Sequence, residues 1–222
     1  VSHTPAFGRG VILFLEKGGL YAVAHLRGGG EYGEEWHRAG MLEKKQNVFD
    51  DLIAGAEFLA REGHAAPERL AIMGGSNGGL LVGAALTQRP ELFRAVVCQV
   101  PLLDMVRYHL FRIARLWIPE YGSADDADAF RWLHAYSPYH HVRDGTRYPA
   151  VLLTTGESDS RVDPLHARKM AARLQAATAS DRPVLLRVET RAGHGQGKPL
   201  SKALEEWADV WTFLFAQLGL EA

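Results

Sequence analysis

The segment Gly74–Gly78, with the sequence Gly-Gly-Ser-Asn-Gly, constrains the fold of this chain more than any other feature. It has the pattern G-x-S-x-G, which places a serine on a sharp turn between a strand and a helix. The context fits, because Leu70–Met73 is a short apolar run typical of a buried strand and Leu80–Leu86 is typical of a buried helix. Small neighbouring residues leave room for the strained turn and for a substrate carbonyl. We therefore predict that Ser76 is a nucleophile.

The rest of the chain alternates apolar runs with helical patterns, which predicts an α/β fold with a mostly parallel central sheet flanked by helices. Together with the serine turn, this alternation indicates the α/β-hydrolase fold. Asn47 is the expected N-cap of the helix that follows it. Beyond the elements around Ser76, we expect strands at 20–24, 95–100, 150–154 and 184–188, and helices at about 47–62, 164–177 and 200–218.

Residues 104–148 break the alternation, since they are rich in aromatic residues, histidine and aspartate and show no clear period. We interpret this segment as an insertion that passes over the carboxyl edge of the sheet. The sequence shows no internal repeat, low-complexity segment or second domain, so we expect residues 1–222 to form one domain.

Composition excludes several classes of function. A net charge of −1 gives no indication of a nucleic-acid partner, and no apolar stretch is long enough to span a bilayer. The single cysteine, Cys98, lies in an apolar run and fits a small core residue. The chain begins at Val1 without an initiator Met or signal-peptide character, so we expect a piece of a longer protein. The expected compartment is the cytoplasm, with the periplasm as the alternative.

A serine hydroxyl needs a neighbouring base to take its proton. In α/β-hydrolases the chain order is serine, acid, histidine, so the base belongs on a loop after the last strand. His194 fits, because it follows the strand expected at 184–188 and its flanking glycines keep it open. We expect activity to rise as this histidine loses a proton near neutral pH. The other late histidines fit less well, since they lie in a helix or before the expected acid: His134, His140, His141 and His166.

Two carboxylates follow the strand expected at 150–154. Asp163 directly precedes Pro164 and a helical pattern, which is typical of an N-cap. Asp159 has no such structural role, so we assign it as the acid that orients the histidine, with Asp163 as the alternative. One oxyanion donor should be the backbone N–H of Asn77, the residue after the nucleophile. The only candidate loop for a second donor is Gly28–Gly30.

Taken together, these residues resemble the prolyl oligopeptidase family over nearly the whole chain. The combination is far more specific than any one motif. The segments that carry the resemblance are Arg27–Gly33 with Trp36 and His37, Lys45–Asn47, Gly74–Gly79, Asp159–Val162 and Ala192–Gly195. Members of this family are serine peptidases that hydrolyse the bond after proline. Their C-terminal α/β-hydrolase domain is joined to a β-propeller that limits entry to short peptides.

The resemblance implies that Ser76 is the nucleophile, Asp159 the acid and His194 the base of a catalytic triad that forms an acyl-enzyme. These positions agree with the assignments made from the residues alone. The resemblance also selects Asp159 over Asp163.

The resemblance further implies a pocket for the substrate proline. Trp117 is similar to the family tryptophan that stacks on the proline ring, and Arg161 to the arginine that holds the preceding carbonyl. A flat indole opposite a rigid ring gives a large apolar contact with little ordering entropy. From the residues alone, Trp117 would be interpreted as a core or lid aromatic. The other implied pocket walls are Leu102, Tyr121 and Val162.

The chain also departs from the family pattern. It contains no propeller, and the family's oxyanion tyrosine would lie just before Val1. We therefore expect an N-terminal propeller segment of the same protein to complete the site. The expected substrates are short proline-containing peptides, and we expect no metal, no cofactor, and no nucleic-acid or membrane partner.

Three other functions stay open at this point. An oligopeptidase that cleaves after basic residues would need acidic residues in the pocket, and Trp117 argues against it. An esterase or lipase on the same fold would have no use for the carbonyl contact of Arg161. An inactive catalytic-domain fragment would fit the missing oxyanion loop, although the intact serine, aspartate and histidine set argues against it.

Overall fold

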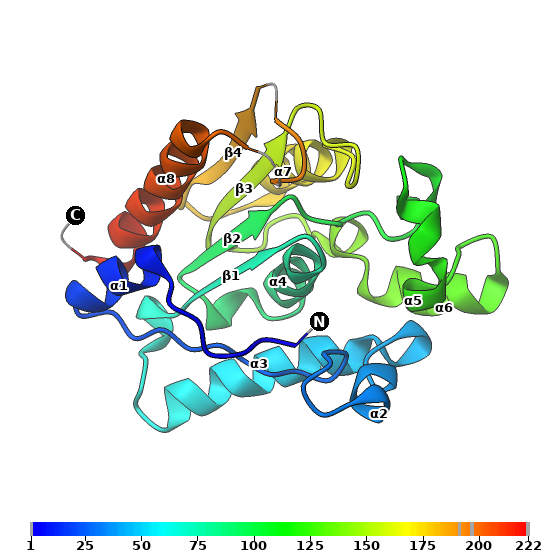
Figure 1. The fold of residues 1–222 in the computed structure, drawn as a ribbon, viewed down its shortest axis with the longest axis horizontal. Coiled ribbons are helices and arrows are strands. Elements are labelled where there is room, and N and C mark those ends of the chain that lie inside the picture. The colour runs from blue at the N-terminus through cyan, green and yellow to red at the C-terminus, as the bar shows by residue number, and fades with distance from the viewer. Residues whose placement is uncertain (1, 191, 196–197, 221–222) are drawn as a thin grey trace.

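The computed structural model describes residues 2–190, 192–195 and 198–220 (Figure 1). Helices and strands alternate along most of the described chain. In chain order they are α1 (Arg9–Glu16), α2 (Glu34–Arg38), α3 (Gln46–Arg61), β1 (Ala71–Gly75), α4 (Asn77–Gln88), β2 (Ala95–Gln99), α5 (Ile118–Tyr121), α6 (Ala127–Tyr136), β3 (Ala150–Gly156), α7 (Leu165–Ala177), β4 (Val184–Glu189) and α8 (Leu200–Leu218). No helix in these described ranges has the length and apolar character needed to cross a membrane.

The described strands form one four-stranded sheet in the order β1-β2-β3-β4, with every pair parallel. Met73 lies opposite Val97, and Val97 lies opposite Leu152. Because all the strands run in the same direction, the loops that follow them gather at one edge of the sheet. The predicted parallel α/β architecture is confirmed, and it brings the loops after β1, β2, β3 and β4 to that common edge.

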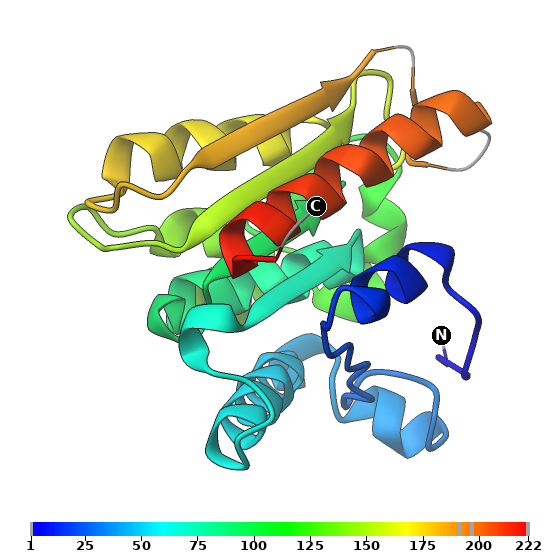
Figure 2. The same ribbon diagram turned by 90° about the vertical axis from the view of Figure 1, so that its left-hand side faces the viewer.

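Apolar side chains alternate between the two faces of the sheet, as the strand period of two requires. Val96 and Cys98 pack with α4 and α7, while Ala95 and Val97 pack with α1 and α8. Figure 2 shows α8 crossing one face of the sheet with α1 beside it. Cys98 is buried and unpaired in this core, which confirms its predicted core role, and burial raises the pKa of its thiol to about 12. The sheet is therefore covered on both sides, as a parallel sheet needs to be.

The strand expected at 20–24 is wrong. The structure has no strand there, and Leu20 and Val23 are each 55% exposed. Within the described ranges, the sheet begins with β1 and these residues belong to no strand pair. An apolar run becomes a strand only when a neighbouring strand takes up its backbone N–H and C=O groups, and composition alone does not supply that neighbour.

Two helix starts were predicted from capping patterns, with different outcomes. Asn47 does not cap α3, which begins at Gln46 with Lys45 as the N-cap; the Asn47 amide instead donates to the Ala39 carbonyl at 2.8 Å. Asp163 is not the N-cap of α7 either, because the helix begins at Leu165 with Pro164 as the N-cap; its Oδ1 nevertheless stabilises the helix start by accepting the Leu165 N–H at 3.0 Å. An asparagine near a helix start therefore does not by itself identify the cap, since its amide finds other carbonyl partners.

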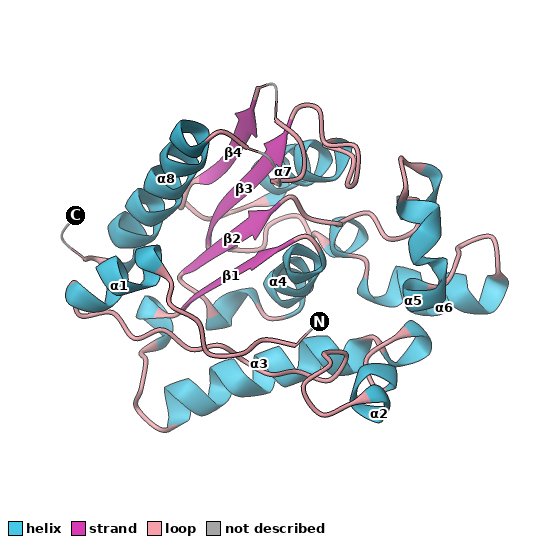
Figure 3. Ribbon diagram, in the orientation of Figure 1, coloured by secondary structure: helices cyan, strands magenta, loops and turns pink. Residues whose placement is uncertain are grey.

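The insertion predicted at 104–148 consists of short helices and loops (Figure 3). It contains α5, α6 and three 3₁₀ helices at Tyr108–Leu110, Ala114–Trp117 and Pro138–His141. Its buried tyrosines Tyr108, Tyr121 and Tyr136 pack in one hydrophobic cluster with Phe49 of α3 and Leu80 of α4. The insertion thus forms a wall beside the residue that follows β1, which is Ser76.

Candidate active site

Ser76 occupies a strained turn between β1 and α4. Its backbone has φ 56° and ψ −115°, a conformation that residues with a Cβ atom rarely adopt. The turn is held by two hydrogen bonds: the Ser76 N–H donates to the Gln99 carbonyl at 2.8 Å, and the Leu80 N–H donates to the Ser76 carbonyl at 3.1 Å. A strained backbone persists only where its surroundings fix it, and such positions cluster at functional sites.

The glycines around Ser76 allow the turn to close. A Cβ atom on Gly74 would lie 2.2 Å from the Gly78 carbonyl oxygen, and one on Gly79 would lie 2.6 Å from Pro101 Cβ. Both distances are far below normal contact, so only glycine fits at either position. A Cβ on Gly78 would meet nothing within 4 Å. Close contact therefore requires glycine at positions 74 and 79 but not at position 78.

Asp159 and His194 form a close pair, although 35 residues separate them. His194 Nδ1 lies 2.7 Å from Asp159 Oδ2, and the Asp159 side chain is fully buried. The loop that carries His194 packs tightly on the end of β3, because a Cβ on Gly156 would lie 2.4 Å from the Gly193 carbonyl oxygen. With hydrogen on Nδ1, the imidazole keeps Nε2 free to accept a proton.

Hydrogen bonds from His194 and from two backbone N–H groups keep Asp159 ionised. Burial pushes the pKa of this carboxyl upward, but hydrogen bonds from His194 and from the Val162 and Arg161 N–H groups outweigh burial, so the pKa lies below its ordinary value. Both N–H groups donate to Oδ1, at 2.9 Å from Val162 and 2.8 Å from Arg161. Oδ2 is thereby left for His194. Asp159 is thus a charged, fixed partner that can orient an imidazole.

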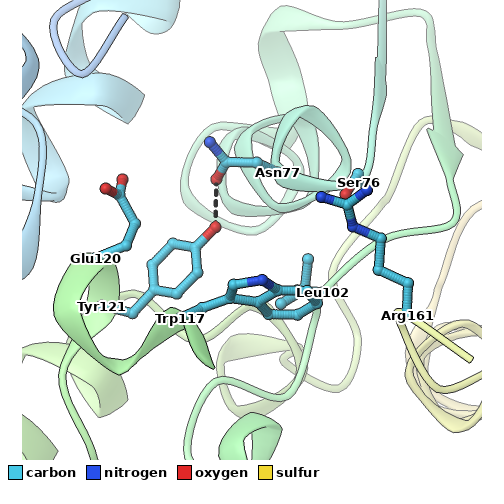
Figure 4. Close-up of a pocket in the computed structure, with 7 residues that line it drawn as sticks. All are labelled: Ser76, Asn77, Leu102, Trp117, Glu120, Tyr121 and Arg161. Carbon is cyan, nitrogen blue, oxygen red and sulfur yellow. Dashed lines mark hydrogen bonds between the residues drawn. The ribbon is translucent and has the colours of Figure 1, made fainter. Parts of the chain in front are cut away.

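A small pocket of about 150 Å³ opens beside Ser76. Figure 4 shows Ser76 and Arg161 on one side of it, Tyr121 and Glu120 on the other, and the Trp117 indole between them. Residues far apart in sequence therefore meet at one place. The residues that line the pocket are Ser76, Asn77, Leu102, Trp117, Glu120, Tyr121 and Arg161.

Arg161 lies near both parts of the candidate site. It follows Asp159, the partner of His194, by two residues, and it lines the same pocket as Ser76. In the described ranges, no hydrogen bond joins the Ser76 hydroxyl to His194, and none occupies the Arg161 guanidinium. The guanidinium is therefore free to bind a carbonyl in the pocket.

Two hydrogen bonds hold Tyr121 in the pocket wall. Its hydroxyl donates to Asn77 Oδ1 at 2.8 Å (Figure 4), and its carbonyl accepts the Trp132 indole N–H at 2.9 Å. Burial raises the pKa of the Tyr121 hydroxyl, so it stays a neutral donor at physiological pH. Asn77 is the first residue of α4, and backbone N–H groups at that position have no partner within the helix. The Asn77 N–H is accordingly available to an oxygen bound near Ser76.

The predicted pocket residues differ in how directly they face the pocket. The residues Leu102, Trp117, Tyr121 and Arg161 line it. Val162 is buried in the same hydrophobic cluster as Leu102 and Tyr121 but is not among the lining residues. Val162 therefore packs with residues of the pocket wall without lining the pocket itself.

Sequence reasoning missed Glu120, which also lines the pocket, and its buried partner Lys45. Glu120 Oε1 accepts a hydrogen bond from Lys45 Nζ at 3.0 Å. Both residues lie in segments that drew notice for other reasons, namely the Trp117–Gly122 stretch and the Lys45–Asn47 motif. The sequence did contain a signal for Glu120, because this carboxylate directly precedes Tyr121, a residue expected in the pocket.

The histidines set aside in the sequence take structural positions. His166 lies in α7, where its Nδ1 accepts the Leu103 and Asp104 N–H groups at 3.3 and 3.1 Å. Burial lowers the pKa of His166 to about 4, so it stays neutral. His134 lies in α6, and His140 and His141 lie in the following 3₁₀ helix. None of them takes the place that His194 has beside Asp159.

The model of the prolyl oligopeptidase family matches residues 5–221. The chain belongs to this family. It is 44% identical over 222 residues to a prolyl endopeptidase from Elizabethkingia miricola, across all of this chain and 32% of that protein. The expectation drawn from the sequence motifs is thereby confirmed.

Solved structures of the prolyl oligopeptidase family agree with the fold. A structure from a study of two prolyl endopeptidases has a TM-score of 0.94 and 58% identity, over 97% of this chain and 32% of that one. Prolyl oligopeptidase B from Galerina marginata has a TM-score of 0.90 and 41% identity, over 94% of this chain and 29% of that one. The chain thus spans about a third of the length of the relatives it matches.

Proposed function

We propose that this chain carries the catalytic site of a serine peptidase that hydrolyses short peptides on the carboxyl side of proline. The observation that carries the proposal is the pocket in which Ser76, Trp117 and Arg161 meet. It combines a strained serine, an aromatic face and a free guanidinium within a space of about 150 Å³. Residues 1–222 would form the peptidase domain.

In the proposed reaction, Ser76 Oγ attacks the carbonyl carbon of proline while His194 Nε2 takes the hydroxyl proton. The carbonyl oxygen becomes an oxyanion that the Asn77 N–H stabilises. The proton then passes from His194 to the leaving amine, the peptide bond breaks, and Ser76 holds the acyl group as an ester. A water molecule activated by His194 hydrolyses that ester and restores the serine. Asp159 stays ionised throughout and stabilises the imidazolium.

The pocket geometry explains a preference for proline. The Trp117 indole offers a flat apolar face, and a rigid pyrrolidine ring loses little entropy on stacking against it. Tyr121 and Leu102 line the same pocket of about 150 Å³, which has room for a five-membered ring. Arg161 would bind the carbonyl before the proline, which fixes the peptide direction relative to Ser76.

The relatives support this assignment of roles. Substrate-bound structures of prolyl oligopeptidase B from Galerina marginata were solved with one serine, one aspartate or one histidine replaced by alanine. Those positions follow one another in the order serine, aspartate, histidine, with separations similar to those of Ser76, Asp159 and His194. Replacing reactive residues is a standard way to keep a substrate intact, and the chain order here is the same.

We also propose that sequence preceding these 222 residues completes the site. The relatives are about three times as long as this chain, and the described loops offer Asn77 N–H as one oxyanion donor where acyl transfer uses two. A preceding propeller segment would supply the second donor and restrict entry to short peptides. The cytoplasm stays the expected compartment, with the periplasm as the alternative.

Matched short peptides that differ only in the residue before the cleaved bond test the proposed function. We expect cleavage after proline, and loss of that cleavage in Ser76→Ala, with any sequence that flanks these residues included in the protein. Faster cleavage after arginine than after proline would contradict proline specificity. Hydrolysis of simple esters without cleavage of proline peptides would favour an esterase instead.

One observation favours the alternative of cleavage after basic residues, because Glu120 places a carboxylate on the pocket wall. That carboxylate is already occupied, however: Oε1 accepts from Lys45 Nζ, and Oε2 lies 3.0 Å from His37 Nε2. A carboxylate with both oxygens bonded within the protein is a poor partner for a substrate cation. The geometry therefore favours proline.

A further inference from the structure

Lys45 is a buried lysine that the proposed reaction does not use. Its side chain is only 2% exposed, although lysine is almost never fully buried unless it is paired. Burial lowers the pKa of Lys45, and the charge and hydrogen bond of Glu120 oppose that effect. The lysine therefore depends on Glu120 as its counter-charge, and the two residues must be considered as one unit.

The Lys45 ammonium contacts two neighbouring residues of α5. Its Nζ donates to Glu120 Oε1 at 3.0 Å and lies 4.9 Å from the centroid of the Tyr121 ring. Tyr121 in turn holds Asn77, beside the nucleophile. One buried cation thus contacts both residues that form the side of the pocket opposite Arg161.

Removing this cation would change the charge of the pocket. Glu120 is a quarter exposed and lines the pocket, and its remaining partner, His37, is about a third exposed. An uncompensated carboxylate beside a partly enclosed pocket attracts a cationic group strongly, because the low local dielectric screens the charge poorly. With Lys45 in place, the carboxylate and the ammonium cancel.

We propose that Lys45 is a specificity-determining residue that neutralises Glu120 and thereby keeps the pocket selective for proline over basic side chains. This inference rests on the proposed peptidase function. In this account, Lys45 forms the ion pair with Glu120 that the side chain of a substrate arginine or lysine would otherwise form.

The experiment compares Lys45→Met, Glu120→Gln and the double variant K45M/E120Q. Lys44→Met is the matched control, because Lys44 is the neighbouring residue in sequence and is exposed. The readout is the ratio of kcat/KM for two short peptides that differ only in having proline or arginine before the cleaved bond. The protein is used with any flanking sequence, and thermal unfolding confirms that each variant is folded.

We expect Lys45→Met to lower the proline-to-arginine ratio at least tenfold, since it leaves Glu120 uncompensated. Adding Glu120→Gln should bring the ratio back to within about threefold of the unsubstituted protein, because no charge then remains. Lys44→Met should leave the ratio unchanged. A merely structural role for Lys45 would lower both rates together and would not be reversed by the second substitution.

An unchanged ratio in folded Lys45→Met overturns the inference, and so does an equal fall in the single and double variants. If Lys45→Met does not fold, the test passes to Glu120→Gln, where the unpaired Lys45 cation should raise the ratio at least threefold. No rise in that variant also overturns it. If the unsubstituted protein prefers arginine, the proposed proline specificity itself is wrong. If the unsubstituted protein prefers proline but the variants behave otherwise than stated, only the inference about Lys45 is wrong.

Discussion

Asp159 shows how a single residue is prepared for its proposed role. The carboxylate is fully buried, yet two backbone N–H groups and His194 hold its pKa below the ordinary value. Because the pKa is depressed in the folded state, the carboxylate stabilises the fold above the ordinary range of an aspartate. That contribution is lost as the pH falls through the depressed pKa.

Replacing Asp159 with Asn should therefore destabilise the protein at neutral pH, by an amount that shrinks as the pH falls below about 4, near the ordinary aspartate value. Urea unfolding at several pH values measures this. Asp181→Asn is the control, because Asp181 is 92% exposed and should give a small difference that does not vary with pH. A pH-independent loss of stability in Asp159→Asn would contradict the account.

The same substitution should also reduce kcat for proline peptides by roughly 10³- to 10⁴-fold, as expected when a triad acid can no longer orient and stabilise its histidine. Steady-state kinetics with the proline peptide measures this. Asp163→Asn is the comparison, because Asp163 instead accepts the Leu165 N–H at the start of α7 and pairs with Arg112. If Asp163→Asn loses as much kcat as Asp159→Asn, the assignment of the acid is wrong.

At the residue scale, local sequence was sufficient to propose Ser76, Asp159 and His194, because the residue types and their order carry the chemistry. It was not sufficient for Lys45. A lysine just before a helix is usually exposed, and its burial depends on Glu120, which lies 75 residues later in the chain. The contact that buries Lys45 exists only after the insertion has folded over α3.

At the scale of elements, the turn between β1 and α4 is determined by close backbone contact. Gly74 lies against Gly78, and Gly79 lies against Pro101, while a Cβ atom added to Gly78 would meet nothing within 4 Å. The G-x-S-x-G pattern predicted this turn because each requirement is local. The strand expected at 20–24 failed because a strand also needs a partner, which no local pattern supplies.

Substituting Gly74 with Ala should destabilise the protein by about 2 kcal/mol or more, because the added methyl group must displace backbone atoms. Gly78→Ala is the matched control, since its methyl group meets nothing within 4 Å and alanine favours the helix by up to about 1 kcal/mol. Thermal or urea unfolding of the two variants measures the difference in their free energies of unfolding. Equal stability in both would show that the turn tolerates a side chain at Gly74.

At the scale of the whole molecule, the parallel sheet is sandwiched between two helical layers, and α1 and α8 form one of them (Figure 2). Trp211 of α8 is 6% exposed and stacks on Phe14 of α1, with ring centroids 5.5 Å apart. The helical period predicted α8 from the sequence. It did not reveal α1 as its partner, because the apolar run at 11–15 is too short to show a period.

Trp211→Ala should lower the free energy of unfolding by about 3–5 kcal/mol, as expected for a buried tryptophan. Trp207→Ala, one helical turn away and 42% exposed, should have a clearly smaller effect. Urea unfolding of both variants measures the difference. Similar losses would contradict the account of α1 and α8 as one packed layer.

The central claim is that Ser76 is the nucleophile of a proline-specific peptidase, and active-site labelling tests it most directly. The protein, with any flanking sequence, is treated with a fluorophosphonate, and the modified residue is located by mass spectrometry. We expect one adduct on Ser76, slower labelling in the presence of a proline peptide, and no adduct or cleavage in Ser76→Ala. A protein that cleaves proline peptides while the adduct lies on another residue, or a Ser76→Ala variant that still cleaves them at a comparable rate, would contradict the account.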